Sequence, residues 1–302
     1  MVQDSVLGFG QSHTSELDST SETYLRNGKN MLETVMRRGE SAAELLDCMR
    51  EHGICVVPGF YPASFIDPIR EACCARMIEP QDMNYADGSY KRVDAYKGTA
   101  AASNERIYHA DCFSPQAELF RHDEMLTQVA SDYYGSPHSV HLCLYERHRP
   151  NDVPVRGFHV DTFELSTFKV MLYLNDVTEQ DGPTSYLMGT HRDADLRYQK
   201  EHVWGPAASP GDPSGQKYPT NFTDEELGLR LQQHVKVTGP QGTIILFDTW
   251  GVHKGISPQP GGERHILVNY YRQGANLPRS DFGFDAQADH KRYHVDYKHR
   301  NA

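Results

Sequence analysis

Two histidines and one aspartate, His159, Asp161 and His253, have the residue types and the spacing of a divalent-metal site. Side chains on an extended strand alternate between its two faces, so His159 and Asp161, two residues apart, are expected to point to the same side. Two imidazoles and one carboxylate on one face of an octahedral ion leave open positions for a bidentate 2-oxo acid and for dioxygen. This ligand set is typical of non-haem iron(II) oxygenases and predicts that chemistry.

The His-x-Asp motif is weak by itself, since it occurs three times and a chain of this composition would contain about one by chance. The pair at 159 is followed by a strand-like segment, a Gly-containing turn, a second strand-like step and the segment 242–248, which delivers His253. The pair His109-Ala-Asp111 follows no strand pattern and is interpreted as a surface or substrate-facing pair. The pair at 294 has no suitable histidine downstream. The context therefore favours the pair at 159.

Arg264 follows His253 after eleven residues and opens the apolar strand 266–271, so its guanidinium is expected to point into the same cavity as the metal. A guanidinium offers a planar fork of donors that matches a carboxylate, whereas a lysine would lose that bidentate geometry. An isolated arginine at a strand start is usually a surface cation. Its spacing from His253 instead predicts that Arg264 binds the far carboxylate of 2-oxoglutarate.

Short strands behind a helical N-terminal part predict a mainly β protein with flanking helices, built on a double-stranded β-helix, the cupin-like jelly roll. Helical periodicity is expected over 29–52, 64–77 and 115–134, with one buried strand at 54–57. Further strands are expected in segments rich in branched and aromatic residues, namely 140–146, 168–174, 235–237, 243–247 and 266–271.

A single jelly-roll domain is expected over 28–302, because all-β barrels and sandwiches often run this long as one unit. Residues 1–27 lack apolar periodicity and are expected to form a flexible arm. A polar insertion at about 193–239, with a capping-box pattern at Thr223 and Glu226, is interpreted as a lid. The His-rich C-terminal segment is compatible with a frayed tail or with an extra element over the barrel mouth.

Three segments resemble the phytanoyl-CoA dioxygenase family, whose members are iron(II)- and 2-oxoglutarate-dependent oxygenases. They are GICVVPGFYPASFIDPIREA at 53–72, LNDVTEQDGPTSYLMGTHR at 174–192 and GTIILFDTWGVHKGISPQPGGERHILVNYYR at 242–272. The resemblance covers about residues 50–272, and the combination is specific although each segment alone is not. Met188 replaces the proline customary in the turn before His191, a departure that affects the turn rather than the chemistry.

The resemblance implies three iron ligands, His159, Asp161 and His253. It also implies that Arg264 binds 2-oxoglutarate, that Lys169 and Met171 face this cosubstrate, and that Leu142 and Glu146 look into the substrate pocket. Relatives often carry a small or apolar residue in place of Lys169, which could add a second cation to the carboxylate of 2-oxoglutarate, reach the substrate or face outward. Glu146 could fix a cationic or hydroxyl-bearing substrate, or be an ordinary edge-strand glutamate.

The expected function is therefore an iron(II)- and 2-oxoglutarate-dependent dioxygenase that uses dioxygen to oxidise a small-molecule metabolite, by default to hydroxylate it, with release of succinate and CO2. Desaturation, ring closure, epoxidation and epimerisation need the same ligands and stay open. The alternative is a non-catalytic or differently metallated cupin-type binding protein. Such a protein has no need of Arg264, which favours the enzyme.

The composition narrows the choice of partners. A formal net charge of -11 and a pI of about 5.8 disfavour a nucleic-acid binder. Apolar stretches stay shorter than the roughly 18 residues of a membrane helix, so no membrane partner is expected. The six cysteines follow no zinc or disulfide spacing and are interpreted as reduced thiols. We expect a cytoplasmic protein that acts on a small molecule and leave a homo-oligomer open.

Overall fold

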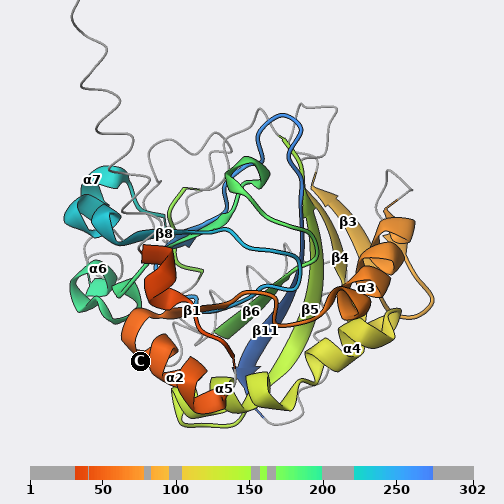
Figure 1. Ribbon diagram of the computed structural model, residues 1–302, viewed down its shortest axis with the longest axis horizontal. Helices are drawn as coiled ribbons and strands as arrows, with labels where there is room; N and C mark the ends of the chain where they lie inside the picture. Colours follow the sequence, from red (N-terminus) through yellow and green to blue (C-terminus); the bar gives the residue numbers. More distant parts are fainter. Residues whose placement is uncertain are drawn as a thin grey trace, which may run out of the picture.

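Two antiparallel sheets carry the fold (Figure 1). The computed structural model describes residues 31–39, 41–77, 83–94, 104–150, 157–161, 168–198 and 221–274. Within these residues the major sheet has eight strands in the order β1-β9-β6-β11-β5-β4-β3-β2, and the minor sheet has three in the order β10-β7-β8. Neighbours that are far apart in the sequence, such as β9 and β6, are the crossovers of a jelly roll, so the predicted fold class is confirmed.

The strands of the major sheet are β1 (Ile54–Val57), β2 (Met83–Asn84), β3 (Tyr90–Asp94), β4 (Asn104–Tyr108), β5 (His138–His148), β6 (Phe168–Tyr173), β9 (Ile244–Asp248) and β11 (Arg264–Gln273). Those of the minor sheet are β7 (Thr184–Leu187), β8 (His234–Val237) and β10 (His253–Lys254). All five strand segments expected from the C-terminal half, and the one at 54–57, are present.

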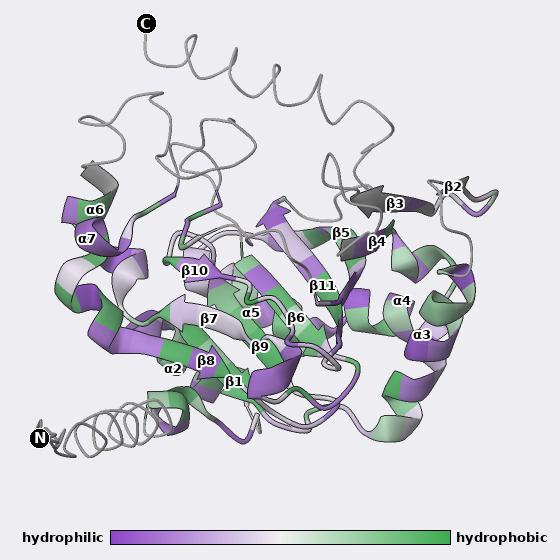
Figure 2. Ribbon diagram, turned by 90° about the horizontal axis from the view of Figure 1, so that it is seen from above, coloured by the Kyte–Doolittle hydropathy of each residue, from purple (hydrophilic) through white to green (hydrophobic). Residues whose placement is uncertain are grey.

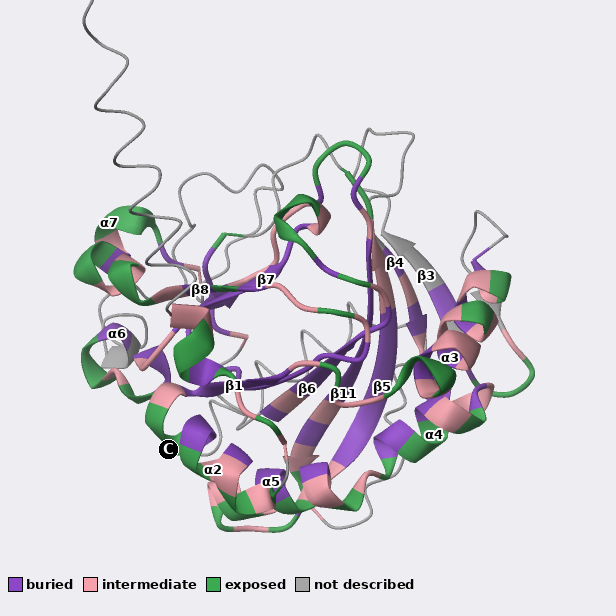
Figure 3. Cartoon of the chain, in the orientation of Figure 1, coloured by how far each residue is buried: buried purple, intermediate pink, exposed green. Residues whose placement is uncertain are grey.

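The helices lie at the outside of the sheets, where their outer faces are exposed (Figures 1 and 3). They are α2 (Ala42–His52), α3 (Ala63–Arg76), α4 (Pro115–Arg121), α5 (Glu124–Tyr134), α6 (Ala194–Tyr198) and α7 (Asp224–Leu227). Helices α4 and α5 pack on β5, and the side-chain amide of Asn269 on β11 donates a 2.9 Å hydrogen bond to the Phe120 carbonyl of α4. These helices cover one face of the major sheet and leave the other face to the minor sheet.

Two of the predicted helices are divided in the structure. The segment expected at 115–134 breaks at Asp123, whose carboxylate caps α5 by accepting a 2.9 Å hydrogen bond from the Leu126 amide. The segment expected at 29–52 is interrupted where Met36 pairs with Val56 of β1, and a new helix then begins with Ser41 as its cap. In both cases a polar side chain caps the start of the second helix, within a periodic pattern that the apolar residues alone would continue.

The N-terminal half is less helical than expected, because β2, β3 and β4 extend the major sheet beyond β5. Strand β4 carries a Glu-Arg pair in place of an apolar alternation, so its sequence gives no strand signal. It is held instead by cross-strand pairing with β5. Glu105 pairs with Arg147, and Arg106 pairs with Glu146 at 2.6 Å.

The register of the three central strands defines one face, here called the inner face. Lys169 of β6 lies opposite Tyr270 of β11, which lies opposite Leu142 of β5. The further residues of this face are Met171, Tyr173, Arg264, Ile266, Val268, Leu144, Glu146 and His148. The inner face looks toward the minor sheet, since the Thr184 hydroxyl of β7 donates to the sulfur of Met171 at 3.3 Å. Figure 2 shows the apolar centres of β5, β6 and β9 beside β7 and β10.

Several expectations concern residues at the margins of the fold. The predicted arm, 1–27, and the C-terminal segment beyond 274 lie outside the described residues, as does the middle of the predicted insertion, 199–220. The end of that insertion forms α7, with the expected capping box at Thr223, and then β8, which belongs to the minor sheet. In the part of the chain that the structure describes, every helix is too short or too polar to span a bilayer.

Candidate functional site

The structure brings His159, Asp161 and His253 together, with one possible ligand atom from each lying within 4.8 Å of the others. The Oδ1 atom of Asp161 is 3.6 Å from Nε2 of His159 and 3.5 Å from Nε2 of His253. These separations are slightly longer than the roughly 3 Å between adjacent ligands of an octahedral ion. Among the described residues this is the one group of three or more such side chains that could hold a metal ion.

Backbone pairing fixes the two histidines on one side of the minor sheet. The amide of His159 donates to the carbonyl of His253 at 2.9 Å, and the amide of His253 donates to the carbonyl of His159 at 2.8 Å. The amide of Asp161 donates to the Thr249 carbonyl at 3.2 Å. His159 also forms a bridge to Asn221, on the side away from His253. Because directly opposed residues of antiparallel strands project to the same face, this pairing sets the imidazoles side by side.

Each imidazole is oriented by a carbonyl two residues before it. Nδ1 of His159 lies 2.9 Å from the Gly157 carbonyl, and Nδ1 of His253 lies 2.9 Å from the Gly251 carbonyl. A carbonyl can only accept a hydrogen bond, so the proton must be on Nδ1 in both rings. Nε2 is thereby left as the lone-pair nitrogen that a metal requires.

Gly251 is tightly packed behind this site, since a β-carbon there would lie 1.7 Å from the hydroxyl oxygen of Tyr186. Tyr186 cannot retreat easily, because it is buried and its hydroxyl donates to the Asp248 carbonyl at 3.0 Å. We expect Gly251→Ala to destabilise the fold by about 1–3 kcal/mol through overpacking, and to weaken metal binding by displacing His253. Thermal unfolding with and without Mn(II) measures both effects.

Gly157 supplies a matched control for that substitution. It also offers its carbonyl to the ligand histidine two residues later, but a β-carbon at Gly157 would have no atom of the described residues within 4 Å. Gly157→Ala is therefore expected to unfold at nearly the wild-type temperature. Equal losses in the two variants would show that the contact with Tyr186 is not what makes Gly251 necessary.

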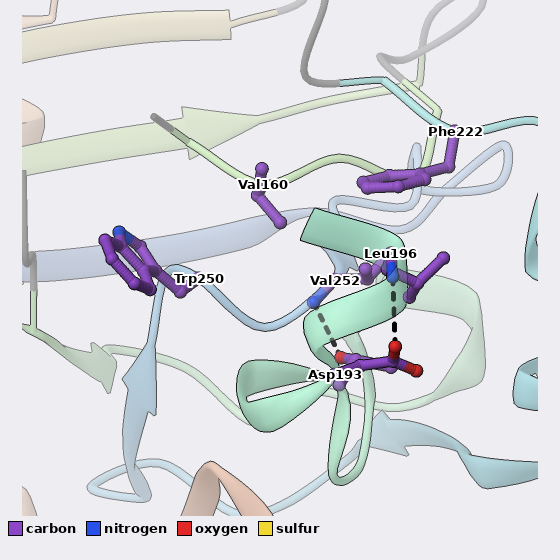
Figure 4. Close-up of a pocket in the computed structure, with 7 residues that line it drawn as sticks. Val160, Asp193, Leu196, Phe222, Trp250 and Val252 are labelled. Carbon is purple, nitrogen blue, oxygen red and sulfur yellow. Dashed lines mark hydrogen bonds between the residues drawn. The ribbon is translucent and has the colours of Figure 1, made fainter. Parts of the chain in front are cut away.

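The alternate residues of the extended segment 157–161 point away from the site. Phe158 and Val160 are buried in a second apolar cluster, together with Leu187, Leu196, Phe222, Leu227 and Val252. Figure 4 shows Val160, Leu196, Phe222 and Val252 around a small pocket on this side, with Trp250 at its edge. This packing holds the strand so that His159 and Asp161 face inward, as their period-two spacing predicts.

Arg264 lies on the inner face and is 2% exposed. Its Nη1 donates to the Gly182 carbonyl. Among the residues that the structure describes, its Nε has no hydrogen-bond partner and no carboxylate lies within ion-pair distance. Burial lowers the pKa of Arg264, but a guanidinium stays protonated in proteins. A buried cation without an anion is costly, so the donor set fits a carboxylate ligand at this point.

Lys169 and Met171 both lie on the inner face, as expected. The Nζ atom of Lys169 is 2.5 Å from Oδ2 of Asp161 and 4.5 Å from the centre of the Tyr270 ring. Burial opposes the charge of Lys169, but the Asp161 carboxylate outweighs it and raises the pKa of Lys169 to about 12. Burial likewise opposes ionisation of Asp161, while the Lys169 ammonium holds the pKa of its carboxyl well below the usual range.

Leu142 and Glu146 are on the same face, and Glu146 already has partners there. Its carboxylate lies 2.6 Å from Nε of Arg106 and 3.1 Å from Nε2 of His148. Although burial opposes the charge, Arg106 and His148 lower the pKa of Glu146. His148 stands directly opposite Arg264, and its own pKa is lowered by burial and by that guanidinium. The sequence carried no signal for Arg106, because β4 itself was not expected.

The second His-x-Asp pair is far less exposed than a surface pair would be. His109 is 5% exposed and Asp111 is 3% exposed, so the surface interpretation is wrong. Asp111 forms a buried ion pair with Arg121 at 2.7 Å, and Arg121 also donates to the Val140 carbonyl. Arg121 thus connects α4 to β5, and Asp111 is not one of the three residues of the candidate metal site.

Comparison with known proteins agrees with this geometry. The family model for phytanoyl-CoA dioxygenase (PhyH) matches residues 49–265. No curated protein sequence matches the chain at a significant level.

Several solved structures share the fold. EctD from S. alaskensis, with 2-oxoglutarate and 5-hydroxyectoine, is 17% identical, with a TM-score of 0.58 over 81% of this chain and 84% of EctD. The carbocyclase SnoK from nogalamycin biosynthesis is 16% identical, with a TM-score of 0.57 over 83% and 92% of the two chains. The epimerase SnoN, in complex with Fe3+, alpha ketoglutarate and nogalamycin RO, is 15% identical, with a TM-score of 0.53 over 77% and 83%.

The family match spans most of the chain and contains the triad and Arg264. The site geometry fits the metal, and the buried guanidinium fits an anionic cosubstrate. The chain therefore belongs to the phytanoyl-CoA dioxygenase family of iron(II)- and 2-oxoglutarate-dependent oxygenases.

Proposed function

We propose that this protein hydroxylates a small-molecule metabolite, using dioxygen and 2-oxoglutarate and releasing succinate and CO2. The observation that carries the proposal is a group of two histidines and one carboxylate in the same fold as a buried guanidinium that has no carboxylate partner among the described residues. A metal-binding cupin without an oxo-acid cosubstrate would gain nothing from burying Arg264, whose desolvation is unfavourable. The complexes of EctD and SnoN named above support the same reading.

Under this proposal His159, Asp161 and His253 hold the iron, and Arg264 receives the far carboxylate of 2-oxoglutarate. When bound, iron(II) supplies the activation of dioxygen and the oxidation of both the cosubstrate and the substrate. The chain itself supplies orientation and exclusion of water. The Gly182 carbonyl accepts a hydrogen bond that orients the guanidinium, while Met171 and Val268, paired on the inner face, add apolar side chains to it.

The substrate decides the outcome of the reaction, because the triad alone is compatible with several. SnoK is a carbocyclase and SnoN is an epimerase, although both share this fold. Hydroxylation needs only that the substrate carbon be held near the metal, whereas ring closure needs a second group of the same substrate placed beside it. We therefore propose hydroxylation, because it requires the protein to position only one group of the substrate.

Metal removal tests the function directly. Purified protein treated with a chelator is expected to release no succinate from 2-oxoglutarate, and added Fe(II) is expected to restore the release, with a further increase in the presence of a substrate. Zn(II) occupies such sites without supporting the redox step, so it should not restore it. Succinate release that is indifferent to the metal, or no release with Fe(II) across metabolite, amino-acid and acyl-thioester candidates, would remove the proposal.

A further inference from the structure

The two carboxylate oxygens of Asp161 have different neighbours. Oδ1 faces the nitrogens Nε2 of His159 and His253, at 3.6 Å and 3.5 Å. Oδ2 forms an ion pair with Nζ of Lys169 at 2.5 Å, although the angles of this contact are not those of a hydrogen bond. The ammonium therefore lies on the side of the carboxylate that is turned away from the two imidazoles. Oδ1 is therefore placed to bind a metal, whereas Oδ2 contacts Lys169 of the major sheet.

The sheet register fixes Lys169 in this position. On β6 it lies directly opposite Phe247 of β9 on one side and Tyr270 of β11 on the other. Its Nζ atom is 4.5 Å from the centre of the Tyr270 ring and 6.0 Å from that of Phe247. The two aromatic rings thus restrict the rotamers of the lysine side chain, which lowers the entropy cost of holding its ammonium in one place. The side chain is only 11% exposed.

Asp161 needs such a partner more than the histidines do. Each imidazole is oriented by a backbone carbonyl of its own strand, whereas Asp161 has Lys169 as its non-ligand ion-pair partner among the described residues. A lysine from the opposite sheet can fix the carboxylate rotation without adding a metal ligand.

We propose that Lys169 is a positioning residue that holds Oδ2 of Asp161, so that the carboxylate meets the metal through Oδ1 alone. This inference rests on the proposed function, because it needs the triad to bind the metal. It assigns Lys169 to the metal centre rather than to 2-oxoglutarate, the role expected from the sequence. A carboxylate held in this way would offer the metal one oxygen rather than two.

The two roles predict different losses when the ammonium is removed. Lys169→Met keeps a long apolar side chain between the two rings but loses the ion pair. If Lys169 positions Asp161, Mn(II) affinity measured in the absence of 2-oxoglutarate should fall by about 10–100-fold, the usual effect of removing a partner of a metal ligand. The affinity for 2-oxoglutarate at saturating Mn(II) should change by less than the affinity for the metal.

Two further variants make the test specific. Lys169→Arg keeps a cation within reach of Oδ2 and should recover part of the lost Mn(II) affinity. Lys236→Met removes a lysine from an exposed ion pair with Glu179 at 2.9 Å and should bind Mn(II) like the wild type. Circular dichroism checks that all three are folded. If Lys169→Met does not fold, an arginine variant that binds Mn(II) within about tenfold of wild type still supports the proposal.

The proposal is overturned if Lys169→Met binds Mn(II) as tightly as the wild type, or if it loses 2-oxoglutarate affinity while its metal affinity is unchanged. Either result is distinguishable from failure of the proposed function. In that failure the wild-type protein itself would show no Fe(II)-dependent succinate release, whatever residue occupies position 169.

Discussion

Asp161→Ala is expected to abolish turnover, lowering substrate-dependent succinate release by at least about a thousandfold. Asp161 is the one carboxylate among the three side chains that could hold the metal. Metal ions contribute several kcal/mol to the reactions that they promote, and each 1.4 kcal/mol is a factor of about ten in rate. The substitution also leaves the ammonium of Lys169 buried without its anion, so Mn(II) affinity and thermal stability should both fall.

Two comparisons separate these effects. Asp161→Asn keeps the shape of the side chain but removes its charge. We expect this variant to keep most of the wild-type thermal stability and to lose most of the Mn(II) affinity. Asp195→Ala removes an exposed carboxylate from α6 and is expected to turn over like the wild type. Substantial activity in a metal-loaded Asp161→Ala protein would mean that the triad is not the catalytic metal site.

The sequence could predict those parts of the site that depend on strand geometry. The period-two alternation is enough to place His159 and Asp161 on one face, and the strand that follows His253 is enough to bring Arg264 to the inner face. The positions of Lys169 and Leu142 on that face were implied by the family resemblance, and an outward-facing Lys169 had been left open. The fold class follows from the same short, regularly spaced strands.

The sequence could not predict contacts between segments whose pairing it does not reveal. Arg106 reaches Glu146 only because the polar strand β4 joins the major sheet. The ammonium of Lys169 forms an ion pair with Asp161, and the spacing of these residues in the sequence does not predict this contact. The need for glycine at position 251 depends on where the Tyr186 hydroxyl packs. Each of these contacts depends on how separate segments pack against one another, which residue spacing alone does not reveal.

Arg264→Met is expected to raise the 2-oxoglutarate concentration needed for half-maximal activity by about 30-fold or more. Losing one partner of a buried, hydrogen-bonded charge pair costs about 2–5 kcal/mol, and every 1.4 kcal/mol is tenfold in affinity. Arg264→Lys keeps the charge but not the planar fork and should fall between the methionine variant and the wild type. The measurement is the dependence of succinate release on 2-oxoglutarate, with Fe(II) saturating.

Thermal unfolding gives an independent check on Arg264, because the free protein buries this guanidinium without an anionic partner among the described residues. Replacing it by methionine loses the hydrogen bond to Gly182 but also relieves an unfavourable desolvation, so the two effects on the ligand-free protein oppose each other. The rise in unfolding temperature on adding 2-oxoglutarate to the metal-loaded protein should disappear, since that rise measures binding. Arg149→Met, at a half-exposed arginine paired with Glu263 at 3.2 Å, should keep it. A ligand-induced rise of wild-type size in Arg264→Met would place the carboxylate of 2-oxoglutarate elsewhere.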